Sequence, residues 1–145
     1  MTYRRMSPAQ VHDFLTAKPA RPGILGTTRA DGRPHLAPIW FLLDESGDVC
    51  FTTGAETIKG RTLRKQSYAV LTVQDDQPPF SFVTVQGPVQ IIDDLAEVRH
   101  WATRIGGHYM GEDRAEAFGA RNGVPGELLV RLHITHTVSA ADVAG

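Results

Sequence analysis

The sequence predicts a mainly β domain with flanking α-helices, in which about six mostly antiparallel strands close into a small barrel. Three observations support this prediction. Short apolar and β-branched runs recur between clusters of turn residues. The connections between neighbouring runs have the length and composition of hairpins, which favours antiparallel pairing. Helical patterns are few and short, and the 145 residues fit one domain over residues 1–145.

The first half of the chain is expected to form a short helix, three strands and a second helix. Ser7-Pro8-Ala9-Gln10 carries the residues of a helix start, with a serine cap and a glutamine that completes a capping box. Turns are expected at 30–33 and 44–48, and Gly32 is free to take a positive φ. The strands are expected over residues 23–29, 34–43 and 49–53, and the second helix over residues 56–65.

The second half is expected to add three strands and two helices. Asp94 can cap the first of these helices, and Gly106-Gly107 are expected to end it. Gly87-Pro88 lies inside a strand and is expected to mark a bulge or an edge position. The strands are expected over residues 68–74, 82–92 and 127–138, and the helices over residues 94–105 and 112–121.

Composition excludes several classes of function. A net charge of -1 argues against a general nucleic-acid binder, whose domain would carry a basic excess. The sequence has no apolar run of about 18 residues, so we expect no membrane span, and its N-terminus lacks the apolar region of a signal peptide. Cys50 is the single cysteine and lies in an apolar run, which predicts a small buried residue in a reducing, cytoplasmic setting.

The segment from Thr52 to Lys65 has the composition of an anion-binding site. Thr52 and Thr53 offer hydroxyls at the end of a strand, and Gly54 permits the turn that follows. Lys59 lies in the first turn of the next helix, where free N–H groups and the helix dipole favour a phosphate or a carboxylate. A solvated basic helix face explains the same composition about equally well.

Helical geometry divides the four cations of this segment into two sets. At 100° per residue, three of them fall within about 100° of each other, whereas Lys59 lies on a different side. Lys59 would then bind the anion nearest the strand end, and the other set would bind an anion further out. This outer set comprises Arg61, Arg64 and Lys65.

Two further stretches could line a pocket. Pro38, Ile39 and Trp40 belong to an apolar strand, and a proline inside a strand is tolerated at an edge or against a ligand. Phe80 and Phe82 are two residues apart and project to the same side of an extended chain. Each stretch also has an ordinary structural explanation, as an edge strand or as core packing.

The sequence offers no dedicated catalytic machinery. Its six histidines are dispersed and lack a zinc-type spacing, so we expect no metal site. It has no nucleophile elbow, and its acidic residues lie mostly at turns and helix starts. We therefore assign no catalytic residue, and a bound redox cofactor would bring its own chemistry.

Four blocks of the chain resemble the pyridoxamine 5′-phosphate oxidase-like split β-barrel superfamily, also called the FMN-binding split barrel. The branch that it resembles most consists of small oxidoreductases that use the deazaflavin coenzyme F420. The block with Lys59, Leu63 and Arg64 is the most specific signal. The blocks are residues 23–34, 38–41, 57–64 and 80–87.

This resemblance implies a homodimer with two cofactor sites at the subunit interface. The phosphate-binding lysine of the family corresponds to Lys59, with Arg64 and Thr53 nearby. The strand that faces the cofactor ring corresponds to Pro38, Ile39 and Trp40. The partner subunit closes the site with residues that match Phe80 and Phe82. Thr62 stands where many relatives have asparagine.

The function implied by the resemblance is hydride transfer from the reduced deazaflavin to a small unsaturated or quinone-like acceptor. The cofactor carries a phosphate and an oligoglutamate tail, and the outer set of cations could bind that tail. Three alternatives remain open at this point. One is an FMN-binding oxidoreductase of the same fold, and another is a non-catalytic protein that binds or stores coenzyme F420. The third is a structural dimeric barrel with a solvated basic helix.

Overall fold

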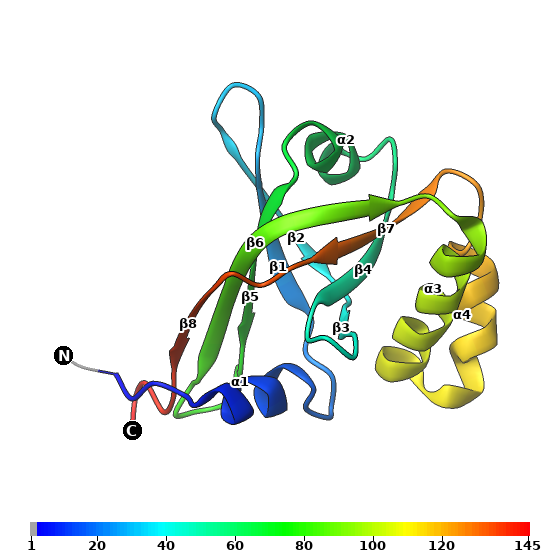
Figure 1. Ribbon diagram of the computed structural model, residues 1–145. Helices are drawn as coiled ribbons and strands as arrows, with labels where there is room; N and C mark the ends of the chain where they lie inside the picture. The colour runs from blue at the N-terminus through cyan, green and yellow to red at the C-terminus, as the bar shows by residue number, and fades with distance from the viewer. Residues whose placement is uncertain (1–2) are drawn as a thin grey trace.

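A computed structural model describes residues 3–145 of the chain as a curled antiparallel sheet with helices around it (Figure 1). The strands are β1 (Gly23–Thr28), β2 (Pro34–Ile39), β3 (Leu42–Leu43), β4 (Val49–Gly54), β5 (Tyr68–Gln74), β6 (Phe82–Ile92), β7 (Glu127–Leu132) and β8 (His136–Ala140). The helices are α1 (Pro8–Leu15), α2 (Ile58–Lys65), α3 (Leu95–Met110) and α4 (Ala115–Asn122), with a 3₁₀ turn, η1 (Glu112–Arg114), before α4.

The two ends of the sheet come together and close the barrel. The strand order is β2-β1-β5-β6-β7-β4-β3, and all pairings are antiparallel. Trp40 and Phe41 are all that separates β2 from β3, so the two ends of this order adjoin. The additional strand β8 pairs with the first half of β6. The predicted fold class, a mainly antiparallel split barrel with flanking helices, is confirmed.

Two predicted strands are each divided in two. The strand expected over 34–43 breaks at Trp40 and Phe41, and the strand expected over 127–138 breaks at 133–135. β6 pairs with β8 up to Gln86 and with β7 from Val89 onward, so its neighbour changes around Gly87 and Pro88. A Cβ added at Gly87 would overlap the carbonyl of His133, so the crossing chain requires glycine there. These residues mark a change of strand partner.

The hydrophobic core fills the barrel, and two helices close its ends. Leu15 of α1 and Leu63 of α2 are buried in the same cluster as the inward-facing residues of the strands. Figure 1 shows α2 and α1 at opposite ends of the barrel, with α3 and α4 beside β4 and β7. The inward-facing strand residues include Leu25, Ile39, Val49, Phe51, Leu71, Val83, Val130 and Leu132.

The helix starts agree with the predicted caps. Ser7 and Gln10 form the capping box of α1, and the Asp94 side chain accepts a hydrogen bond from the Ala96 N–H at the start of α3. The prediction that Gly106-Gly107 end this helix is wrong, because α3 continues to Met110. Gly106 is required instead for close packing of helices, since a Cβ there would overlap Phe118 of α4.

Within residues 3–145, every helix is too short or too polar to cross a bilayer.

Candidate functional site

A cavity of about 330 Å³ lies where β2, β4, α2 and the α3–α4 pair meet. Five residues that the sequence nominated for cofactor binding line it together, although they come from three separate segments. These are Pro38, Ile39, Trp40, Thr52 and Lys59. We call this cavity the Lys59 pocket. The remaining lining residues are Pro22, Ala102, Ile105, Gly106 and Asn122.

The two threonines at the end of β4 point in opposite directions. Thr52 lines the pocket, on the face of β4 that carries Cys50 and that α3 covers. Thr53 is 4% exposed and lies on the inner face. Its hydroxyl is 3.1 Å from that of Thr57, the N-cap of α2. Thr53 therefore stabilises the helix start, whereas Thr52 is available to a ligand.

The Thr57 cap sets the position of Lys59. The Thr57 hydroxyl accepts from the Gly60 N–H at 3.0 Å and donates to the Gly54 carbonyl at 2.8 Å, so Thr53 must be the donor in the threonine pair. A Cβ at Gly60 would overlap the Gly54 carbonyl oxygen. Glycine at position 60 thus allows α2 to start directly against the end of β4, which places Lys59 in the pocket.

Trp40, which lines the pocket, is supported from behind by two further aromatic rings. The rings of Trp40 and Tyr109 are parallel, with centroids 5.1 Å apart, and Phe118 meets Trp40 edge-on. The Tyr109 hydroxyl donates to the Arg21 carbonyl at 2.8 Å and accepts from the Phe41 N–H at 3.2 Å. Burial raises the pKa of Tyr109 to about 12, and the two hydrogen bonds of its hydroxyl fix the ring that stacks on Trp40.

A second cavity of about 330 Å³ lies between α2 and the β1–β2 hairpin. We call it the basic groove, because it is lined by Arg29, Arg61 and Lys65. Arg29 was not nominated by the sequence, and its Nε is buried without a partner among residues 3–145. Lys59 lines the first cavity, whereas Arg61 and Lys65 of the same helix line the second, so α2 separates the two cavities. The helical geometry predicted this division between Lys59 and these two cations.

Arg64 does not join the basic groove. Its guanidinium donates to the Ala55 carbonyl at 2.7 Å and pairs with Glu56 at 3.3 Å. The structure therefore separates Arg64 from the outer set in which the sequence analysis grouped it. Its contacts tie the last turn of α2 to the loop that precedes this helix.

Phe80 and Phe82 lie away from both cavities within one subunit. Phe82 is the first residue of β6 and pairs with Gln74 and Ala140. Phe80 is 36% exposed and has a φ of 60° in the preceding loop. Figure 1 shows this β5–β6 connection at the end of the barrel opposite α2.

Sequence reasoning missed the wall that α3 and α4 contribute. Ala102, Ile105, Gly106 and Asn122 line the Lys59 pocket, but no spacing or motif in those helices marks them as site residues. They reach the pocket because α3 docks on β4 and β7 through Val98, Trp101 and Ile105, which pack with Cys50 and Leu129. That docking is a tertiary contact between segments distant in the sequence.

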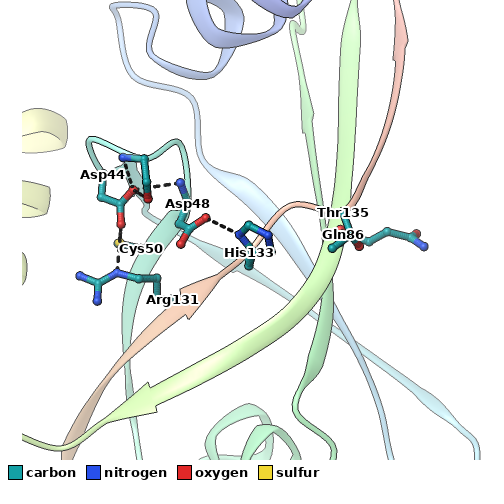
Figure 2. Close-up of polar contacts among 8 residues, drawn as sticks. Asp44, Asp48, Cys50, Gln86, Arg131, His133 and Thr135 are labelled. Atoms are coloured by element: carbon teal, nitrogen blue, oxygen red, sulfur yellow. Dashed lines mark hydrogen bonds and ion pairs between the residues drawn. The ribbon is translucent and has the colours of Figure 1, made fainter.

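A polar cluster beside this docking surface serves the structure (Figure 2). Arg131 Nε lies 3.0 Å from Asp44 Oδ2, at an angle that makes the contact an ion pair rather than a hydrogen bond. Cys50 is fully buried nearby, as predicted, and burial raises the pKa of its thiol to about 11. Asp48 contacts His133 at 3.0 Å and links the β3–β4 turn to the segment after β7.

The fold and the pocket define a class of protein, the split β-barrels with a cavity at the start of a cationic helix. The sequence profile of pyridoxamine 5′-phosphate oxidase matches residues 7–138, so the chain belongs to the pyridoxamine 5′-phosphate oxidase family. No curated protein matches the sequence.

Solved structures share the whole fold at low sequence identity. A conserved hypothetical protein from Mycobacterium tuberculosis is 23% identical with a TM-score of 0.83, over 98% of this chain and 91% of that one. An F420 reductase is 24% identical with a TM-score of 0.68, over 87% and 94%. A heme storage protein from Vibrio cholerae is 15% identical with a TM-score of 0.69, over 94% and 96%. These likenesses establish the fold and leave the activity open.

Proposed function

We propose that the protein is an oxidoreductase that uses coenzyme F420 to reduce a small unsaturated or quinone-like acceptor. The observation that carries the proposal is the pair of cavities on either side of α2. The Lys59 pocket combines a cation with an apolar wall, and the basic groove gathers three further cations. A cofactor with a flat ring, a phosphate and a long anionic tail uses both cavities.

The residues present fit such a cofactor. Lys59 and Thr52 would bind the phosphate, because an ammonium and a hydroxyl are suitable donors to its oxygens. Pro38, Ile39 and Trp40 would pack against the ring. The Arg29 guanidinium and its two neighbours in the basic groove would pair with the carboxylates of the tail, and the buried Nε of Arg29 would gain an acceptor.

When bound, reduced coenzyme F420 supplies a hydride, and the chain supplies binding, orientation and exclusion of water. Trp40 is held by the Tyr109 stack, which gives the pocket a rigid apolar face. Asn122 adds an amide to the pocket wall and is available to orient an acceptor.

We further propose that the protein is a homodimer in which each partner completes the other's site. The observation behind this is an apolar sheet face that no element of residues 3–145 covers. Ile24 is 40% exposed, Leu36 is 67% exposed and Val138 is 48% exposed. Neighbouring subunits commonly bury such faces. Pro38 pairs with Ile24 and also lines the Lys59 pocket, so the face continues into the site.

Within one subunit, Phe80 and Phe82 lie far from the Lys59 pocket. In the dimer, we expect the partner's Phe80 and the partner's Phe82 to close the site. We place the dimer in the cytoplasm, where a free buried thiol such as Cys50 stays reduced.

FMN in the same pocket is the second candidate. It carries a ring and a phosphate that Lys59 could bind, but it has no tail to occupy the basic groove. Titrating the purified protein with each cofactor and following fluorescence distinguishes the two. Tight binding of FMN with none of coenzyme F420 would reverse the preference. Binding of coenzyme F420 without turnover on a broad panel of acceptors would favour a storage role.

The Lys59→Ala substitution tests the phosphate assignment. We expect it to weaken binding of coenzyme F420 by about tenfold or more at low salt, because a charge-assisted contact is worth roughly 1.5–3 kcal/mol. The wild-type advantage should shrink as the salt concentration rises. Lys18→Ala removes an equal charge from an exposed position outside both cavities and should leave affinity unchanged. Equal affinities of wild type and Lys59→Ala would remove Lys59 from the site.

A further inference from the structure

Glu127 places a carboxylate at the turn that leads to the cation that we assign to the phosphate. It is the first residue of β7 and pairs with Gly54, the last residue of β4. Paired residues of antiparallel strands project to the same face, and Thr52 lies two residues along that face in the pocket. Glu127 Oε1 would lie 3.7 Å from a Cβ at Gly54, so this carboxylate covers the turn that leads to Lys59.

Lys59 and Glu127 carry opposite charges near this end of the pocket. In the part of the chain that the structure describes, Lys59 is the one cationic side chain that lines the Lys59 pocket. Arg61 and Lys65 line the basic groove beyond α2, and Arg64 donates to a backbone carbonyl. An anion at Lys59 therefore meets one ammonium and, close by, one carboxylate.

The environment of Glu127 makes its charge effective. The residue is half-buried, and burial raises the pKa of its carboxyl, while the Lys59 ammonium partly opposes that rise. A charge that is partly removed from water acts on its neighbours more strongly than an exposed one, since solvent and salt screen it less.

We propose that Glu127 makes the phosphate site selective for a phosphodiester over a phosphomonoester. A diester carries one negative charge, whereas a monoester carries about 1.5 to 2 at neutral pH. A single lysine next to a carboxylate can accommodate the first, but the additional charge of the second is repelled. The inference rests on the proposed function and deepens it, because the phosphate of coenzyme F420 is a diester and that of FMN is a terminal monoester.

The Glu127→Gln substitution tests this role, since it removes the charge and keeps the size of the side chain. Wild type and variant are titrated with coenzyme F420, with FMN and with riboflavin, which has the ring of FMN without its phosphate. Glu56→Gln is the matched control, because Glu56 belongs to the same turn but is exposed and pairs with Arg64. Thermal unfolding of each protein is measured alongside, and Glu127→Ser serves as a second neutral variant.

We expect Glu127→Gln to bind FMN roughly tenfold more tightly than wild type at low salt, and coenzyme F420 at most about threefold more tightly. Riboflavin affinity should not change, and Glu56→Gln should resemble wild type with all three ligands. The gain for FMN should diminish at about 0.5 M salt, where charges beyond a few ångström are screened.

Two failures can be told apart. If the ratio of FMN affinity to coenzyme F420 affinity is the same in wild type, Glu127→Gln and Glu127→Ser, the role of Glu127 is overturned and the proposed function stands. FMN binding that stays undetectable in both Glu127→Gln and Glu127→Ser also overturns the role of Glu127 and leaves the proposed function standing. If wild type does not bind coenzyme F420, the proposed function itself is overturned.

Discussion

Asp44 illustrates how a single side chain supports the scaffold on which the site rests. Its Oδ1 accepts hydrogen bonds from the Ser46 N–H, the Ser46 hydroxyl and the Asp48 N–H, and its Oδ2 pairs with Arg131. Burial alone would raise the pKa of Asp44, but these hydrogen bonds and the Arg131 charge outweigh burial and lower it. Asp44 therefore stabilises the β3–β4 turn in its charged form (Figure 2).

This lowered pKa gives the folded state a pH dependence of known sign. The stabilisation is present above the unfolded-state pKa of about 3.8 and is lost as the pH falls through the lower folded-state value. We expect Asp44→Asn to lose about 1–3 kcal/mol of unfolding free energy at pH 7, and the gap to wild type to narrow as the pH falls below about 3.8. Urea unfolding at several pH values measures this.

The control for that prediction is Asp76→Asn, which removes an exposed aspartate from the β5–β6 loop. Its unfolding free energy should stay within about 0.5 kcal/mol of wild type at each pH. A gap for Asp44→Asn that does not narrow at any pH below about 3.8 would mean that the charge of Asp44 is not the source of the stability.

At the residue scale, the sequence predicted site residues where local chemistry marks them. Lys59 is recognisable because it follows a strand end and a capping threonine in a helix start. Thr52 and Thr53 could not be distinguished, because only the alternation along β4 decides which of them enters the core. Glu127 and Asn122 carry no local signal, and strand register or helix docking brings them to the site.

At the scale of elements, the α3–α4 pair forms a wall of the pocket, and glycines set the distance between the two helices. A Cβ at Gly106 would overlap Phe118, and one at Gly119 would overlap the Thr103 hydroxyl. Gly106 was predicted to end the helix, since glycine is a poor helix former. Packing determined the outcome, since the close approach of α4 requires glycine in the middle of α3.

The sign of the stability change caused by Gly106→Ala distinguishes helix propensity from packing against Phe118. Helix propensity alone predicts that alanine stabilises the protein by about 1 kcal/mol. Because the added methyl meets Phe118, we expect destabilisation by about 1–3 kcal/mol instead, measured by urea or thermal unfolding. In a double-mutant cycle, Phe118→Gly should reduce the cost of Gly106→Ala, because it removes the Phe118 Cβ, which would lie 2.3 Å from the added methyl. A stabilised Gly106→Ala protein would contradict the packing explanation.

Element boundaries were predicted well where turns or caps mark them. The hairpin turns have Gly32 and Gly47 at φ values of 89° and 88°, and β5 and β6 have the predicted bounds. The sequence did not predict the breaks at Trp40-Phe41 and at 133–135, because these are bends that the closure of the barrel imposes. No glycine or proline lies at either break to signal it.

At the scale of the whole molecule, the barrel has one outer side covered by α3 and another formed by β2, β1, β5, β6 and β8. Alternation along these strands places apolar residues on both faces, one face toward the core and the other toward the exterior. Thr72 and Thr84 pair across the middle of the outer face at 2.7 Å, which satisfies their hydroxyls within the sheet. The hydroxyls of this outer face are therefore paired with each other, and its rim is apolar. Both features suit contact with a second copy of the chain.

Leu36→Asp tests the proposed dimer. Leu36 is 67% exposed in one subunit, so a charge there should cost little in the monomer but is costly when buried in an interface. We expect wild type to be a dimer at micromolar concentration by light scattering, and Leu36→Asp to be a folded monomer. Leu95→Asp is the control, because Leu95 is exposed at the acid-tolerant start of α3. If the partner closes each site, Leu36→Asp should also bind cofactor more weakly than Leu95→Asp. A monomeric wild type that binds cofactor fully would show that one subunit is sufficient.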